Sequence, residues 1–134
     1  MPKDAAPWIL AAGVFNLALA VFHLSFWRLF GWPGSLSESG AVNRGVTQVL
    51  NLAITYLFVL SAVVCFTFPS ELAGTALGRF WLMAMVGFWA ARALIQPSFF
   101  GLRRPLSIVL FGVFILGAVI HGTAWATARA SVAV

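Results

Sequence analysis

Four long apolar segments follow one another along the chain, separated by short stretches rich in glycine, proline and polar residues. We expect helices at about residues 8–30, 43–66, 74–96 and 105–127. Each segment has roughly the 20 residues that an α-helix needs to cross the hydrocarbon core of a bilayer. The pattern predicts an all-α protein, an integral membrane antiparallel four-helix bundle that forms a single transmembrane domain over residues 1–134.

Helix-breaking residues set these expected boundaries. The stretch Gly-Trp-Pro-Gly at residues 31–34 follows the first segment, and Pro69 follows the second. Pro97 is expected to end the third helix, because proline lacks the N–H that a helix interior requires. Pro105 begins the fourth segment, and proline is favoured at the first helical position.

A polar stripe interrupts the second apolar segment. Arg44, Gln48, Asn51 and Thr55 follow one another at spacings of four, three and four residues. On a helix these spacings place all four side chains on one face. Polar groups are costly inside a bilayer unless they face other helices or a cavity. We therefore expect this face to meet polar partners on neighbouring helices.

Depth along the antiparallel helices suggests which residues are those partners. At about 1.5 Å per residue, Gln48 and Arg92 lie roughly 6 Å from one membrane surface, and His23 and Asn51 lie roughly 10 Å from it. The resulting candidate ligand-binding cluster comprises His23, Arg44, Gln48, Asn51, Arg92 and Gln96. Near the opposite surface, Asn16 and His121 fall at similar depths and form a candidate secondary polar pair.

Composition strengthens the membrane interpretation. The chain is 62% hydrophobic and 8% charged, whereas soluble domains carry about 25% charged residues. Lysine and arginine number 8 and acidic residues 3, which gives a net charge of +5. The basic residues are scattered near predicted helix ends, where they are expected to meet lipid phosphates rather than nucleic acid. The single cysteine, Cys65, excludes an intrachain disulfide.

The distribution of basic residues predicts the orientation. One side of the membrane would hold Lys3, Arg79 and Arg129, and the other Arg28, Arg44, Arg92, Arg103 and Arg104. Because cytoplasmic loops carry an excess of Lys and Arg, the second side is expected to be cytoplasmic. The expected location is the bacterial inner membrane, with both termini in the periplasm.

No predicted span contains a carboxylate that would neutralise an intramembrane arginine. Asp4, Glu38 and Glu71 all lie in end regions. The functional hypothesis is that Arg92 meets an anionic ligand, such as a lipid phosphate. The alternative is that the amides and His23 form interhelical hydrogen bonds, each worth roughly 0.6 kcal/mol, while the arginines extend to lipid headgroups.

The chain lacks the sequence motifs of common catalytic and metal sites. It contains no HExxH, GxSxG, CxxC, P-loop or GxGxxG unit, so no catalytic residue, metal site or enzymatic activity is expected. His23 and His121 are a potential pair of haem ligands, but their depths place them toward opposite surfaces, which argues against a single haem between them. No cofactor is predicted, and haem or quinone binding remains open.

Three local patterns resemble a group of uncharacterised bacterial four-helix integral membrane proteins of about this length. They are FHLSFWRLFGW at residues 22–32, Asn43-Arg44 with Gln48 and Leu50-Asn51-Leu52, and FWAARA at residues 88–93 with Gln96 and Phe99-Phe100. In addition, His23 followed by Leu29-Phe30-Gly31-Trp32 is similar to the first helix of the DoxX-like family. Some members of that family are linked to respiratory or redox complexes, but the later helices here do not match the family, so no residue role is carried over from it.

Three functions remain open from the sequence. The first is a small membrane protein that binds or transports an anionic or amphipathic, lipid-like ligand in a polar intramembrane cluster. The second is an accessory subunit that packs against a larger membrane complex, respiratory or photosynthetic, or against another copy of itself. The third is a haem- or quinone-binding redox protein.

Overall fold

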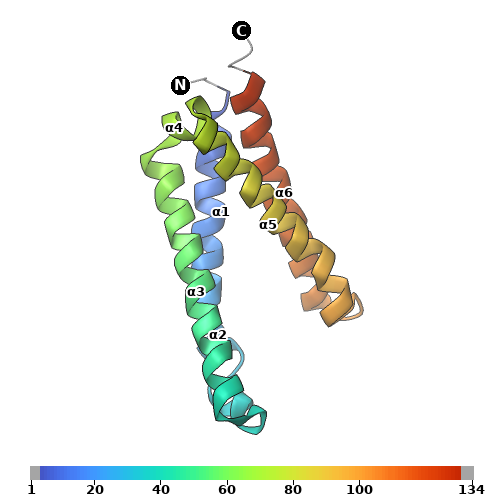
Figure 1. The fold of residues 1–134 in the computed structure, drawn as a ribbon. Coiled ribbons are helices and arrows are strands. Elements are labelled where there is room, and N and C mark those ends of the chain that lie inside the picture. The colour runs from blue at the N-terminus through green and yellow to red at the C-terminus, as the bar shows by residue number, and fades with distance from the viewer. Residues whose placement is uncertain (1–3, 131–134) are drawn as a thin grey trace. The chain divides into compact units, whose positions relative to one another are not determined.

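The computed structural model describes residues 4–130, and all regular secondary structure within them is helical (Figure 1). The elements are α1 (Ala6–Leu24), α2 (Phe26–Leu29), the 3-10 helix η1 (Gly34–Ser39), α3 (Gly40–Thr67), α4 (Pro69–Gly74), α5 (Ala76–Phe100) and α6 (Pro105–Ala130). The prediction of an all-α fold is confirmed. Lys3, which entered the orientation prediction, lies outside the described residues.

Among residues 4–130, three helical segments are long and apolar enough to cross a membrane: Ala6–Leu24, Gly34–Thr67 and Pro105–Ala130. Helix α5 is not among them, because Arg79, Arg92 and Gln96 lower its mean hydropathy. Its 25 residues nevertheless extend about 38 Å, more than the hydrocarbon thickness of about 30 Å. Helix α5 therefore has the length of a membrane span but a more polar composition than the other three.

The chain divides into two compact units. The first, the α1–α3 unit, comprises Gly13–Val64 and so contains the second half of α1, α2, η1 and most of α3. The second, the α5–α6 unit, comprises the described residues 4–12 and 65–130, and contains the first half of α1, the last residues of α3, and α4, α5 and α6.

In the α1–α3 unit, α1 and α3 lie side by side (Figure 1). The helix expected over residues 8–30 is interrupted at Ser25, where α1 ends and the single-turn helix α2 follows. The Ser25 hydroxyl donates to the Phe22 carbonyl at 2.6 Å. Serine side chains compete in this way with the backbone for helical hydrogen bonds. Gly31 then adopts a positive φ of 65°, a conformation that turns the chain away from the helix direction.

In the α5–α6 unit, α5 packs mainly against α6, and α4 contacts both. The side chains of Leu82, Met85 and Trp89 on α5 are buried, as is Phe114 on α6. The rings of Trp89 and Phe114 stack with their centroids 6.0 Å apart and their planes at 21°. On α5, the buried residues Leu82, Met85 and Trp89 recur every three or four positions, which is the spacing of one buried helix face.

The prediction that Pro97 ends the third helix is wrong. Helix α5 continues through Pro97 to Phe100, and the Gly101 amide donates to the Pro97 carbonyl at 3.0 Å. A proline removes the backbone bond to the residue four positions earlier, but it leaves its own carbonyl able to accept. The helix therefore gains one further turn, although the Ala93 carbonyl cannot receive the usual bond from position 97.

The close contact of α4 with α5 depends on Gly78. A Cβ atom at this position would overlap the backbone of Glu71 and Leu72 in α4, well inside van der Waals distance. We predict that Gly78→Ala lowers the free energy of unfolding by about 1–3 kcal/mol, because backbone atoms cannot move aside as a flexible side chain does. Thermal unfolding in detergent, followed by circular dichroism, measures this loss.

Gly87 supplies the matched control, because it lies on the same helix, is exposed, and has open space where a Cβ atom would be added. Gly87→Ala should leave stability unchanged or raise it by about 0.5–1 kcal/mol through reduced backbone entropy. Equal stability of the two variants would contradict close packing of α4 on α5.

Candidate functional site

His23 and Asn51 form a reciprocal pair within the α1–α3 unit. His23 Nδ1 lies 2.8 Å from Asn51 Oδ1, and Asn51 Nδ2 donates to the His23 carbonyl at 3.0 Å. His23 is in the last turn of α1, and Asn51 is near the middle of α3, where it is only 5% exposed. Depth matching placed these two residues at the same level, and the structure confirms that they are in contact.

The two bonds together determine the imidazole tautomer. Because the amide nitrogen of Asn51 donates to a backbone carbonyl, the group facing His23 must be the amide oxygen. That oxygen only accepts, so the proton lies on His23 Nδ1. In the neutral ring the lone pair is then on Nε2, the arrangement in which a histidine can accept a proton or bind a metal through Nε2.

Aromatic rings hold the imidazole in place. The ring of Phe26 stacks on His23 with centroids 4.6 Å apart, and Phe58 of α3 meets it edge-on at 5.2 Å. Phe22 makes a further edge contact at 5.9 Å. Such contacts contribute beyond simple burial of area, so the orientation of His23 is fixed by packing as well as by hydrogen bonds.

Gln48 is bonded one turn before Asn51. Its Oε1 accepts from Trp27 Nε1 at 3.1 Å, and its Nε2 donates to the Arg44 carbonyl at 3.1 Å. Trp27 was not among the candidate residues predicted from the sequence, and this contact was missed. The sequence spacing could have predicted this contact. Trp27 follows His23 by four residues and Gln48 precedes Asn51 by three, so on antiparallel helices the two residues are expected to be neighbours when His23 and Asn51 are.

The polar stripe of α3 is therefore largely satisfied inside the α1–α3 unit. Thr55 also donates to the Asn51 carbonyl at 2.7 Å. Both ends of the Gln48 and Asn51 amides are engaged, and each amide joins α3 to the segment containing α1 and α2. Chemically, this arrangement fixes the register of two helices.

Arg92 lies on α5 in a different setting. Its guanidinium carbon is 4.5 Å from the centroid of the Phe114 ring, and the side chain is half-buried. Phe114 follows Pro105 by nine residues, so it lies about 14 Å along α6 from its first residue. Arg92 lies eight residues before the end of α5, at about the same distance from the 101–104 connection, so the guanidinium lies against α6 at about its own level.

Gln96 lies one turn after Arg92 and is 2% exposed. Its Nε2 donates to Ser107 Oγ at 3.0 Å, and Ser107 Oγ donates to the Gly101 carbonyl. Because the single hydroxyl proton is used on Gly101, Ser107 must accept from Gln96, and the amide orientation is fixed. Gln96 Oε1 is buried and has no hydrogen-bond partner within residues 4–130.

The six candidate residues fall into two groups. His23, Arg44, Gln48 and Asn51 belong to the α1–α3 unit, whereas Arg92 and Gln96 belong to the α5–α6 unit. A single site that combines all six stays a prediction. The roles of Ser107 and Phe114 were not anticipated, because spacing within one helix does not indicate which residue of another helix lies opposite.

The Asn16–His121 pair also stays a prediction. Asn16 belongs to the α1–α3 unit and His121 to the α5–α6 unit, and both side chains are buried. His121 Nδ1 donates to the Gly117 carbonyl at 2.7 Å, and its ring lies 6.4 Å from that of Trp89. This backbone bond again leaves the lone pair of the neutral imidazole on Nε2.

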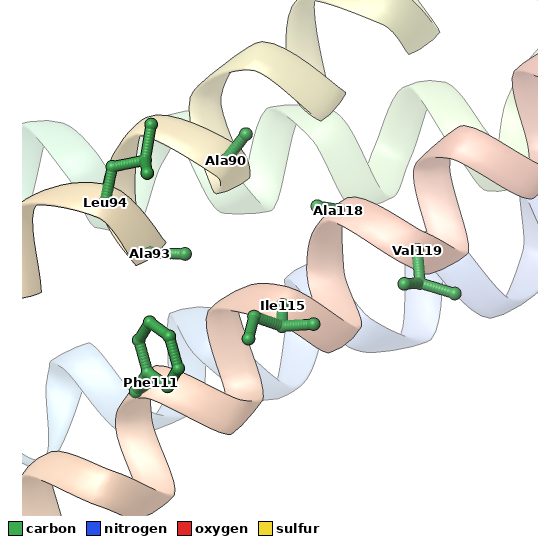
Figure 2. Close-up of a pocket in the computed structure, with 7 residues that line it drawn as sticks. All are labelled: Ala90, Ala93, Leu94, Phe111, Ile115, Ala118 and Val119. Carbon is green, nitrogen blue, oxygen red and sulfur yellow. The ribbon is translucent and has the colours of Figure 1, made fainter.

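An apolar groove of about 460 Å³ runs along the α5–α6 pair (Figure 2). Three residues of α5 and four of α6 line it: Ala90, Ala93, Leu94, Phe111, Ile115, Ala118 and Val119. The alanines create the space, and the larger side chains form its walls. Arg92 precedes Ala93, and Phe114 precedes Ile115, so the arginine lies on the same stretch of the helix pair without lining the groove.

Within the described part of the chain, no three or more His, Cys, Asp or Glu side chains come together as metal ligands would. Comparisons with protein-family models, with curated proteins and with solved structures found no match. The resemblances noted in the sequence therefore stay expectations.

We predict that Asn51→Leu removes both bonds to His23 and lowers the free energy of unfolding by about 1 kcal/mol, at roughly 0.6 kcal/mol per interhelical bond. Nitrogen-15 NMR of the imidazoles provides a second measurement. The wild-type His23 signal, assigned by its loss in His23→Gln, should show the Nδ1-protonated tautomer, and Asn51→Leu should abolish that preference.

Asn43→Ala is the matched control, because Asn43 is exposed on the same helix. It should leave both the tautomer and the stability unchanged. An Nε2-protonated His23 in the wild-type protein would contradict the pairing.

Proposed function

We propose that the chain is a multi-pass protein of the bacterial inner membrane, a four-helix bundle with both termini in the periplasm. We further propose that it binds an anionic amphipathic, lipid-like ligand on the α5–α6 unit and has no enzymatic activity. The observation that carries this proposal is the position of the Arg92 guanidinium over Phe114, on a helix pair that contains no carboxylate.

The charges of the described residues favour an anionic partner for Arg92. An arginine at the centre of a membrane-spanning helix costs about 2.5–3.5 kcal/mol on insertion scales, and the cost for Arg92 is lower because it lies eight residues before the end of α5. A cation–π contact with a desolvated ring contributes about 2 kcal/mol or more but leaves the net charge in place. The chain's three acidic residues lie before α1, in η1 and in α4. A ligand phosphate that approaches Arg92 would supply the missing charge through bidentate hydrogen bonds.

The groove provides a place for the apolar part of such a ligand. Its lining is made of alanine, leucine, isoleucine, valine and phenylalanine side chains, which suit a hydrocarbon chain. Ala93 of the lining is the residue after Arg92, so the groove and the guanidinium lie at the same level of α5 but on different faces of the helix. A ligand with a charged head on Arg92 would have to pass its apolar tail around α5 to reach the groove.

The polar residues of the α1–α3 unit have a supporting role in this proposal. The amides of Gln48 and Asn51 are engaged in bonds that fix α3 against α1 and α2. In this proposal Arg44, which is half-buried in the second turn of α3, meets lipid headgroups at the cytoplasmic surface.

We predict that Arg92→Ala reduces retention of an anionic lipid at least tenfold. The purified protein in detergent would be given equal amounts of phosphatidylglycerol and phosphatidylcholine with identical acyl chains, and native mass spectrometry would count the bound lipids. The wild-type protein should retain phosphatidylglycerol selectively, because only this lipid brings a net negative charge to Arg92.

Two variants serve as controls. Arg92→Lys keeps the positive charge and should therefore keep part of the selectivity for phosphatidylglycerol. The rest of the selectivity should be lost, because lysine cannot make the two parallel hydrogen bonds that arginine makes to a phosphate. Arg79→Ala removes an arginine from the same helix, one that donates to the Ala73 carbonyl at 3.3 Å, and should leave retention unchanged. Undiminished retention in Arg92→Ala would contradict the proposed function.

An accessory-subunit function is the second candidate, and the groove is the feature that favours it. Small residues such as Ala90, Ala93 and Ala118 allow another helix to approach closely. Purification from native membranes in a fixed stoichiometric complex would support this function. A Soret band in the purified protein would instead favour the haem-binding alternative.

A further inference from the structure

Gln96 Oε1 is a buried acceptor with a fixed direction and no partner within the described residues 4–130. Rotating the amide does not relieve it, because the Ser107 proton is already donated to the Gly101 carbonyl. Leaving a buried polar atom without a hydrogen bond is unfavourable, and most such atoms in native proteins have a protein or water partner. The oxygen therefore requires a donor that the described part of the chain does not supply.

The surrounding charges restrict what that donor is. Arg92 lies one turn earlier on the same helix, and Arg103 and Arg104 lie in the connection that leads to Ser107. A ligand ammonium group would be repelled by these three cations. A neutral hydroxyl donates a hydrogen bond without that repulsion.

We propose that the ligand of the α5–α6 unit is a phosphodiester lipid whose headgroup carries a hydroxyl, with the phosphate on Arg92 and the hydroxyl donating to Gln96 Oε1. This inference rests on the proposed function and specifies its ligand class. Side chains four residues apart lie on the same face of a helix, with Cβ atoms about 5–6 Å apart. A headgroup in which a hydroxyl lies a few bonds from the phosphate spans a distance of that order.

The last turn of α5 gives the hydroxyl a route to the covered oxygen. Pro97 leaves the Ala93 carbonyl without its usual helical bond, which weakens the helix directly after Gln96. Residues 97–100 are all exposed. Displacement of this turn would uncover the Gln96 amide without disturbing the Trp89–Phe114 stack earlier in the helix pair.

The test compares two lipids of equal charge and identical acyl chains. Phosphatidylglycerol carries two headgroup hydroxyls, whereas phosphatidylmethanol has a methyl ester and no donor. In native mass spectrometry of the wild-type protein, phosphatidylglycerol should be retained about fivefold better, the value of one net hydrogen bond. Equal retention of both lipids, lost together in Arg92→Ala, would overturn this inference and leave the proposed function standing. A buried water would then be the partner of Gln96 Oε1.

Variants locate the hydroxyl contact. Gln96→Met keeps the size of the side chain but lacks the amide oxygen, so it should retain the two lipids equally. Ser107→Ala keeps Oε1 but removes the bond that fixes the amide, so the freed amide can rotate and the preference should be weaker than in the wild-type protein. A preference that persists in Gln96→Met would overturn the inference. If that variant does not fold, the wild-type comparison of the two lipids decides the question alone.

Two other outcomes would contradict the proposed function itself, and not only the hydroxyl contact. Retention of neither lipid by the wild-type protein, or retention that does not depend on Arg92, would remove the anion site. The hydroxyl contact would then have no ligand to act on.

Discussion

A guanidinium stays charged in a protein, because its pKa lies far above neutral pH. Arg92 therefore brings a permanent positive charge into the α5–α6 pair, where it rests on the face of Phe114. The ring compensates part of that charge, and neither helix offers a carboxylate. An apolar groove lies at the level of Arg92 on another face of α5, and the proposal of a lipid ligand rests on the charge together with this groove.

The polar side chains of the two units differ in how fully they are hydrogen-bonded. In the α1–α3 unit, His23, Gln48 and Asn51 bond to one another's helices and to Trp27. In the α5–α6 unit, the Arg92 guanidinium lies over an aromatic ring, and the amide oxygen of Gln96 is buried without a partner in residues 4–130. A satisfied network fixes structure, whereas unsatisfied groups of complementary chemistry mark a place for a ligand. This contrast is the reason for placing the ligand on α5 and α6.

The sequence predicted the helices and one tertiary contact, for reasons that can be traced to particular residues. Apolar segments of membrane length identified the helical fold, and equal depth on antiparallel helices brought His23 to Asn51. The break at Ser25 and the continuation through Pro97 were missed, because each depends on a few local hydrogen bonds. Which residue of α6 faces Arg92 depends on the rotation of two helices about their axes, which spacing along one helix does not determine.

The most direct measurement of the central claim is a cryo-electron microscopy map of the protein in nanodiscs made from native inner-membrane lipids, with a bound antibody fragment to aid alignment. The account predicts a non-protein density of phosphate size within hydrogen-bond distance of the Arg92 guanidinium, continuous with a tail along Ala93 and Ile115. A map in which Arg92 extends to the headgroup layer, or bonds to a carboxylate of the chain, with the groove empty, would contradict it.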